Sequence, residues 1–346
     1  MRRILHAALK ILIILVFAAC SKDDRSTPEK IDVYVLFSPE GFCNSGYNDI
    51  TLKSIEKSSQ KYGFEYSFYV PETIEMGMEF YNSWLNGYPA GDGRTLFIFA
   101  SAMYEEHLAQ AQHPEPGTGK DILLFETESS LPYAYTFAMS YYGASYFIAS
   151  YHLGLEWCDF KILAANPYTN GLGYMTDGII SAIEDNPSGD VECYYLGEQP
   201  HEGFDEQEEA FITCKFLSVN DTLQNNLYIP YAGLSNMGVY RFSETNTRTA
   251  IGMDSIDPNF YTSIHMSMNK RIDLAIDDFL VLWIKGEEVP RNRFYTLESG
   301  RVEVMKRTFL EEYFKDSMNN LYNQAISKEK EYFKSRNQEL AATDIS

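Results

Sequence analysis

The chain has few of the residues from which catalytic and metal sites are built. Its 346 residues include six histidines, and no two of them have the spacing of metal ligands on a helix. His201-Glu202-Gly203, for example, has no second histidine four residues after the first. A Gly-x-Ser-x-Gly turn, which exposes the nucleophilic serine of many hydrolases, is also missing. We therefore expect a protein that is not an enzyme, with no catalytic residues, no metal and no cofactor.

Positive charge and phosphate-binding features are scarce as well. The chain has 28 lysines and arginines against 49 aspartates and glutamates, which gives a net charge of −21. Gly117-Thr-Gly-Lys120 is reminiscent of a phosphate-binding loop, but it precedes a predicted strand and lacks Ser or Thr after the lysine. A protein this acidic repels a phosphate backbone, so we expect no nucleic-acid partner.

No apolar run reaches the length that a membrane-spanning helix needs. The short run at 11–17 follows a positively charged flank and precedes two alanines and Cys20, an order typical of a secretory signal. Small residues before a cysteine resemble the lipobox of bacterial lipoproteins. We expect 1–19 to be a signal peptide and Cys20 to be lipidated. An ordinary cleaved leader followed by a chance cysteine is the alternative.

The segment 20–29 is polar and has no apolar periodicity, which favours a flexible tether. Its Ser21-Lys-Asp-Asp24 run resembles the acidic surface-export tags of Bacteroidetes lipoproteins, and Ser21 is not the aspartate of an inner-membrane retention signal. We expect the lipid to be the sole membrane attachment in the cell envelope. The outer membrane is favoured, with exposure at the cell surface as a further option.

Four cysteines follow the tether, at 43, 158, 193 and 214. Their spacings fit neither a zinc site nor a dense disulfide scaffold. Cys193 and Cys214 lie on neighbouring predicted elements and could pair, but unpaired core thiols fit the sequence equally well.

Apolar strands alternate with amphipathic helices along the rest of the chain, in two successive series. Strands buried on both faces are continuous apolar runs, and their alternation with helices indicates parallel sheets with right-handed crossovers. The sequence therefore predicts an α/β fold of two doubly wound parallel-sheet lobes. The expected strands are 31–37, 64–70, 95–100, 122–125 and 135–138 in the first series, and 160–165, 191–196, 226–232 and 249–253 in the second.

Residues that directly follow a strand are candidate site residues, because doubly wound sheets bind ligands beyond the carboxyl ends of their strands. Asp254 follows the strand at 249–253, and its carboxylate could accept two hydrogen bonds from a vicinal diol. A turn-capping role is the alternative. Gly233 ends a strand and opens a helix, where backbone N–H groups favour an acceptor on a ligand. A tight turn would explain this glycine equally well.

Four blocks in the correct order resemble the basic-membrane-protein family of substrate-binding lipoproteins, the purine nucleoside receptor type. The first, Asn44-Ser-Gly-Tyr47-Asn48, is similar to the family's Asp-Lys-Ser-Phe-Asn loop. The others are the strand, glycine turn and helix at 226–242, the Ile-Gly-Met-Asp block at 250–255, and Ser-Met-Asn-Lys-Arg at 267–273. The resemblance covers about residues 30 to 305.

This resemblance implies the type I periplasmic-binding fold, in which a three-crossover hinge joins two lobes that close on a small ligand. It divides the chain into an N-terminal lobe of 30–138 plus 254–287 and a C-terminal lobe of 139–253 plus 288–340. The expected crossovers lie near Met139, Met253 and Glu288. It further implies that the ligand is handed to an ABC transporter permease for uptake.

The family's ligand is a purine nucleoside, so the resemblance also implies roles for matching residues. Tyr47 would stack on the base, Asp254 would bind the ribose hydroxyls, and Lys270 would donate to the sugar. Asn44, Asn48, Glu126 and Gly233 complete the expected site. A core or lid aromatic is the alternative for Tyr47, and a solvated lysine or a partner of Asp273 is the alternative for Lys270.

Three positions depart from the family pattern. The family's aspartate in the first loop is Asn44, its glutamate in the mid-chain helix is Tyr142, and its aspartate after the fourth strand is Glu126. These changes motivate a second hypothesis, in which a surface lipoprotein uses the same fold for sensing or for holding a protein, such as an outer-membrane complex, without transport.

Overall fold

The computed structural model describes residues 30–39, 41–42, 47–87, 93–115, 117–155, 158–220, 225–254, 256–313 and 315–336. Two predicted functional residues, Cys20 and Asn44, lie outside these described residues, as do the expected signal peptide and tether. Among the helices that the structure describes, none combines the length and the hydropathy of a membrane-spanning segment.

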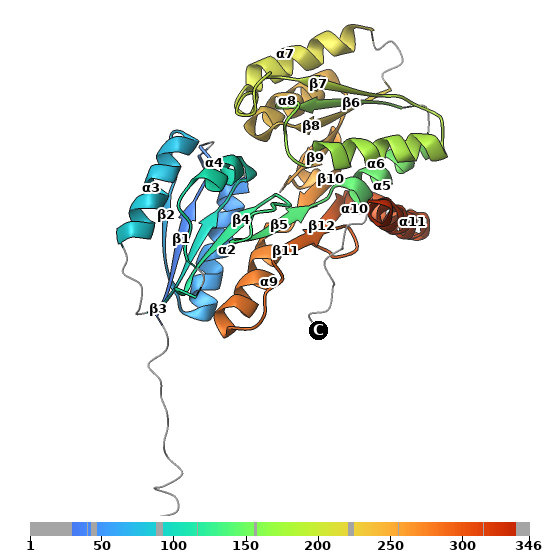
Figure 1. Ribbon diagram of the computed structural model, residues 1–346. Helices are drawn as coiled ribbons and strands as arrows, with labels where there is room; N and C mark the ends of the chain where they lie inside the picture. The colour runs from blue at the N-terminus through green and yellow to red at the C-terminus, as the bar shows by residue number, and fades with distance from the viewer. Residues whose placement is uncertain are drawn as a thin grey trace, which may run out of the picture.

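Two six-stranded sheets form the centres of two separate lobes (Figure 1). Sheet A has the order β11-β5-β4-β3-β1-β2 and all its strands are parallel. Sheet B has the order β12-β10-β9-β8-β6-β7 and is parallel except for β12. The strands of sheet A are β1 (Lys30–Leu36), β2 (Glu65–Tyr69), β3 (Gly93–Phe99), β4 (Lys120–Phe125), β5 (Ala134–Met139) and β11 (Asn292–Tyr295). Those of sheet B are β6 (Asp159–Ala164), β7 (Val191–Tyr195), β8 (Asn226–Tyr231), β9 (Thr249–Met253), β10 (Ile264–Lys270) and β12 (Val302–Lys306).

The helices are amphipathic and bury their apolar faces in the lobe to which they belong. Helix α9 is an example, because its buried residues recur every three or four positions from Ile272 to Trp283. The first lobe has α2 (Tyr47–Tyr62), α3 (Ile74–Gly87), η1 (Ala102–Tyr104), α4 (Glu105–Gln110) and α9 (Ile272–Lys285). The second has α5 (Tyr142–Leu155), α6 (Leu172–Asp185), α7 (Gln207–Leu217), η2 (Ser218–Asn220), η3 (Gly233–Ser235), α8 (Asn236–Asn246), η4 (Pro258–Phe260), α10 (Thr308–Tyr313) and α11 (Lys315–Ser335).

The predicted fold class is confirmed, but the predicted division of the later chain between the lobes is wrong. Strand β10, expected in the N-terminal lobe, pairs with β9 in sheet B, and β11, expected in the C-terminal lobe, pairs with β5 in sheet A. The chain therefore crosses between lobes at 139–142, 270–272 and 295–302. The cause is burial: alternate residues Met266 and Met268 of β10 complete the core beside β9.

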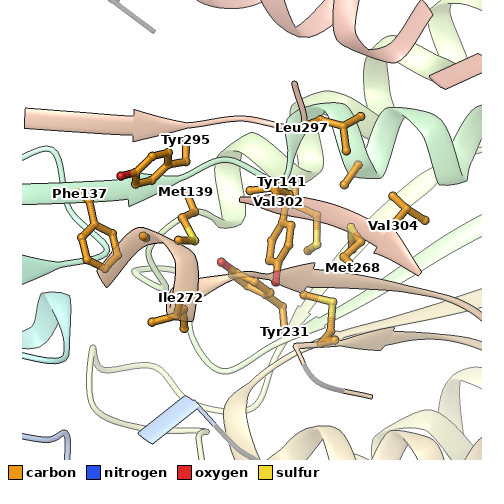
Figure 2. Packing of buried hydrophobic residues seen from close by; sticks show 14 of the residues in the cluster. Phe137, Met139, Tyr141, Tyr231, Met268, Ile272, Tyr295, Leu297, Val302 and Val304 are labelled. Carbon is orange, nitrogen blue, oxygen red and sulfur yellow. The ribbon is translucent and has the colours of Figure 1, made fainter. Parts of the chain in front are cut away.

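The three crossovers are held together by one apolar cluster that continues from lobe to lobe. Figure 2 shows Met139 and Tyr141 of the first crossover, Ile272 of the second, and Tyr295 and Val302 of the third. All five side chains are almost fully buried. The hinge is therefore a packed core, which places the facing strand ends of the two sheets accurately.

The question left open for the cysteines is answered for those that the structure describes. Cys193 and Cys214 are both free thiols, so the pairing between them does not form. Burial raises the pKa of the Cys214 thiol to about 12, which keeps it protonated and unreactive.

Candidate functional site

A cavity of about 170 Å³ lies between the lobes, at the carboxyl ends of both sheets. Its lining includes Tyr47 and Glu126 from the first lobe and Tyr231, Asp254 and Lys270 from the second. A cavity of about 150 Å³ is enough to hold benzene, so this one has room for at least one ring of a ligand. The site is therefore suited to a small cyclic molecule.

Each of these five side chains occupies the end of a strand or the element that follows it. Tyr47 is the first residue of α2, and Glu126 and Asp254 directly follow β4 and β9. Tyr231 and Lys270 are the last residues of β8 and β10. The cavity thus has the position at which doubly wound sheets bind their ligands.

The two carboxylates are presented by a strained backbone. Glu126 has a φ of 61° and Asp254 a φ of 58°, in the left-handed region that favours glycine. Such a conformation costs about 1–2 kcal/mol for a residue with a Cβ atom. Strain of this kind is concentrated at functional sites, where the surrounding structure maintains it. The left-handed turn points both carboxylates at the cavity.

Glu126 is the centre of a buried polar network. Lys270 Nζ lies 2.7 Å from its Oε2 atom, and the Tyr47 hydroxyl donates to Oε1 at 3.3 Å. The side chains of Lys270 and Glu126 are only 8% and 14% exposed. Burial lowers the pKa of Lys270, but the charge and the hydrogen bond of Glu126, together with Tyr231 and Asp254, outweigh this effect and raise the pKa, so the lysine stays protonated. The positive charge of Lys270 therefore lies inside the cleft.

Asp254 is the carboxylate with the weakest compensation. Among the described residues, the Tyr141 hydroxyl donates a hydrogen bond to its Oδ1 atom, at a long 3.4 Å. Burial raises the pKa of Asp254 above its ordinary value, although the positive charge of Lys270 partly opposes this. A buried carboxylate with one weak donor favours a ligand that brings further donors.

The ring of Tyr231 forms part of the cavity wall, and the buried ring of Tyr141 packs beside it. The rings of Tyr141 and Tyr231 lie side by side in Figure 2, with centroids 6.0 Å apart in an edge-to-face arrangement. Lys270 Nζ lies 4.9 Å from the centroid of Tyr141, within the range of a cation–π interaction. The Tyr231 hydroxyl donates to the carbonyl of Asn170 at 2.8 Å, which fixes the ring against the cavity.

Of the other predicted site residues, Gly233 lines the cavity and Asn48 does not belong to its described lining. Gly233 has a left-handed φ of +55°. Asn48 is buried, and its Nδ2 atom donates to the carbonyls of Gly41 at 2.8 Å and Ser38 at 3.3 Å. It therefore ties Ser38 and Gly41 to the start of α2. Tyr142 is buried against Tyr332 in the second lobe, with ring centroids 4.2 Å apart.

The sequence analysis missed several residues of the site, among them Tyr231 and Asn170 in the lining and Tyr141 next to Asp254. Tyr231 is the last residue of β8 and lies within the predicted strand 226–232, so the rule that identified Asp254 could have found it. Tyr141 and Asn170 had no such signal, because they belong to a hinge crossover and to the loop before α6. Within the described residues, no group of three or more His, Cys, Asp and Glu side chains is arranged to hold a metal ion.

No family model matches the chain, and no curated protein matches it in sequence. Solved structures match it in fold. An ABC transporter solute-binding protein of Aeropyrum pernix K1 superposes with a TM-score of 0.66 at 14% identity, over 87% of this chain and 86% of that one. A transcriptional activator of the comK gene from Bacillus halodurans gives 0.63 at 14% identity, over 86% and 97%.

A periplasmic solute-binding protein of Actinobacillus succinogenes with bound D-allose gives a TM-score of 0.59 at 13% identity, over 82% of this chain and all of that one. At these identities the likeness establishes the architecture. Such neighbours include solute-binding proteins of ABC transporters, which are not enzymes. The chain has the type I periplasmic-binding-protein fold.

Proposed function

We propose that this chain is a lipid-anchored solute-binding protein that captures a small ligand, foremost a purine nucleoside, between its two lobes for uptake. The observation that carries the proposal is the convergence of Tyr47, Asp254 and Lys270 on one cavity between the lobes. Tyr47 comes from the first lobe and the other two from the second, so a ligand that contacts all three draws the lobes together.

The chemistry of the cavity suits a nucleoside. The aromatic side chains of Tyr47 and Tyr231 offer flat apolar surface to a base. Asp254 can accept hydrogen bonds from both hydroxyls of a ribose, and an ionised acceptor makes such bonds stronger. The ordered resemblance of 30–305 to the basic-membrane-protein family supports the same ligand, and the solved solute-binding proteins support capture of a small solute.

The location of the protein is part of the proposal. Lipidation at Cys20 would tether the lobes to the envelope through 20–29, with the outer membrane favoured. An ABC transporter permease would then receive the ligand. Mass spectrometry of the N-terminal peptide tests the anchor: a diacylglyceryl adduct on Cys20 supports it, and an unmodified N-terminus elsewhere rules it out.

A thermal-shift screen tests the ligand. The panel contains purine and pyrimidine nucleosides together with D-allose and other monosaccharides. We expect nucleosides to raise the melting temperature of the wild type and to have little effect on Asp254→Asn. The matched control is Asp205→Asn, because Asp205 is an exposed aspartate of the same lobe. Stabilisation by sugars alone would retain solute capture and reject the nucleoside.

A non-transport role is the second candidate. The solved transcriptional activator of the comK gene from Bacillus halodurans has this fold. Together with the departures at Asn44 and Tyr142, it favours a surface lipoprotein that senses a ligand or holds a protein. Neighbouring genes discriminate the two: permease and ATPase genes favour uptake, and genes for sensors or outer-membrane complexes favour the second role.

A further inference from the structure

We propose that the segment Glu126-Thr127-Glu128 is an interlobe latch, which holds the two lobes together before a ligand binds. The inference rests on the proposed function, because it concerns closure of the same cleft. It adds Thr127, Glu128 and Tyr174, which are outside the described lining of the ligand cavity, as residues that regulate the affinity of the site.

Three side chains of the second lobe donate hydrogen bonds to this short segment of the first lobe. Lys270 Nζ bonds the Glu126 carboxylate at 2.7 Å, and Asn170 Nδ2 bonds the Glu126 carbonyl. The Tyr174 hydroxyl bonds the carboxylate of Glu128. Each contact runs directly from one lobe to the other, so the lobes cannot separate unless these bonds lengthen or break.

Both sides of the latch are anchored in their own lobes. The backbone N–H of Thr127 donates to the carbonyl of Phe137 at 3.2 Å, and the Thr127 hydroxyl donates to Glu105, so the segment is fixed to the first lobe. On the other side, Tyr174 belongs to α6 and packs edge-on against Phe333 of α11 in the same lobe. Because both sides are fixed, rotation of one lobe against the other changes the distances of the latch contacts.

The latch and the ligand cavity share residues but are separable. Lys270, Glu126 and Asn170 line the ligand cavity. Tyr174 and Glu128 instead line a second, polar cavity of about 250 Å³ beside it. A change at Tyr174 or Glu128 therefore alters lobe closure and leaves the described ligand cavity intact. This separation makes the proposal testable.

The expected consequence follows from population arithmetic. Contacts made only in the closed form shift the equilibrium toward that form. The apparent dissociation constant of a ligand equals its intrinsic value divided by the closed fraction. A weakened latch therefore raises the dissociation constant while every ligand contact is retained.

The experiment is single-molecule energy transfer on the purified full chain without ligand. Dyes are attached through genetically encoded azide side chains at Glu79 on α3 and Glu209 on α7, which are exposed positions on different lobes. The variants are Lys270→Met, Tyr174→Phe and Glu128→Gln. The control is Lys161→Met, because Lys161 makes a 2.6 Å ion pair with Glu192 inside the second lobe.

We expect the wild type and Lys161→Met to share a predominantly closed distribution. Tyr174→Phe, which removes the donor, should lower the closed-to-open ratio by roughly three- to tenfold, as expected for one solvent-exposed hydrogen bond. Glu128→Gln should lower it less, because the glutamine side-chain oxygen can still accept from the Tyr174 hydroxyl. Lys270→Met should lower it further than either.

Two results would overturn the proposal: a wild type that is mainly open, or distributions that do not change in Lys270→Met and Tyr174→Phe. Neither depends on the ligand, so this outcome is independent of the nucleoside screen. Adenosine titrations add a second readout. If adenosine binds, Tyr174→Phe should weaken it by the same factor as the closed fraction falls, and a normal affinity with a smaller closed fraction would contradict the latch.

Discussion

Glu126 and Asp254 occupy matching positions in the two lobes. Each follows the fourth strand of its lobe in chain order, β4 and β9, and each has a left-handed backbone with φ near 60°. The two lobes therefore present one acidic residue each to the cavity by the same local device. Their partners differ: Glu126 is paired with Lys270 at 2.7 Å, whereas Asp254 receives a 3.4 Å hydrogen bond from Tyr141.

This difference predicts that the carboxylate of Asp254 lowers the stability of the fold while it favours ligand binding. Burial raises the pKa of Asp254, which means that the folded protein disfavours the charged form. Asp254→Asn removes the charge and keeps the shape, so we expect a higher melting temperature than the wild type at neutral pH. We also expect the gain to shrink as the pH falls through the raised pKa of the wild-type carboxyl and to be gone below its ordinary pKa of 3.8. Calorimetry at two pH values measures both, and an equal or lower melting temperature at neutral pH would contradict the prediction.

We expect a side chain at position 233 to destabilise the fold. The φ of +55° at Gly233 is strained for alanine, and an added Cβ would lie 3.3 Å from the Phe204 ring and carbonyl. We expect Gly233→Ala to reduce the free energy of unfolding by about 1–2 kcal/mol and to weaken ligand binding through displacement of Phe204. Chemical denaturation measures the first effect. Gly154→Ala is the control, because an added Cβ there would meet no atom within 4 Å and its φ is not in the left-handed region.

Asn48 has a structural role in the fold, whereas the sequence predicted that it binds the ligand. Its buried amide donates to the Ser38 and Gly41 carbonyls, and Asn48→Ala would remove both bonds and leave the Ser38 carbonyl with the long 3.4 Å bond from the Gly41 N–H. We expect a loss of about 1–3 kcal/mol in the free energy of unfolding. Ligand affinity measured well below the melting temperature should change less than in Asp254→Asn. A normal stability with abolished binding would restore Asn48 to the ligand site.

Glu329 predicts a pH dependence of stability at the hinge. This buried residue of α11 accepts hydrogen bonds from the backbone N–H groups of Gly143 at 3.1 Å and Leu297 at 2.9 Å, beside two crossovers. Burial outweighs these bonds and raises its pKa from 4.5 to about 7, and the charge of Glu298 adds to the rise. The folded chain therefore binds this proton more tightly than the unfolded chain does.

Protonation of Glu329 therefore stabilises the folded chain. This stabilisation is complete below about pH 4.5 and is lost as the pH rises through about 7. Relative to Glu329→Gln, which cannot titrate, the wild type should lose roughly 3 kcal/mol of unfolding free energy between pH 5 and 8. Urea denaturation of both proteins across this range measures the difference. Parallel curves would show that Glu329 does not titrate there.

Much of the site was predictable because its signals are local. Asp254 follows an apolar strand, and in a parallel sheet that position alone places a side chain at the binding edge. Tyr47, Glu126, Gly233 and Lys270 also line the cavity, and their ligand contacts stay predictions. Asn48 shows the limit of this approach, because a polar residue in a matching loop can serve the loop itself.

The sequence by itself determined the alternation of strands and helices, since continuous apolar runs and helical periodicity are properties of short segments. Only the tertiary structure decided which sheet β10 and β11 join, because that choice depends on which core each strand completes. It also brought Lys270 to Glu126, 144 residues away in the chain. Contacts between lobes depend on how two finished sheets face each other, and no local pattern records that arrangement.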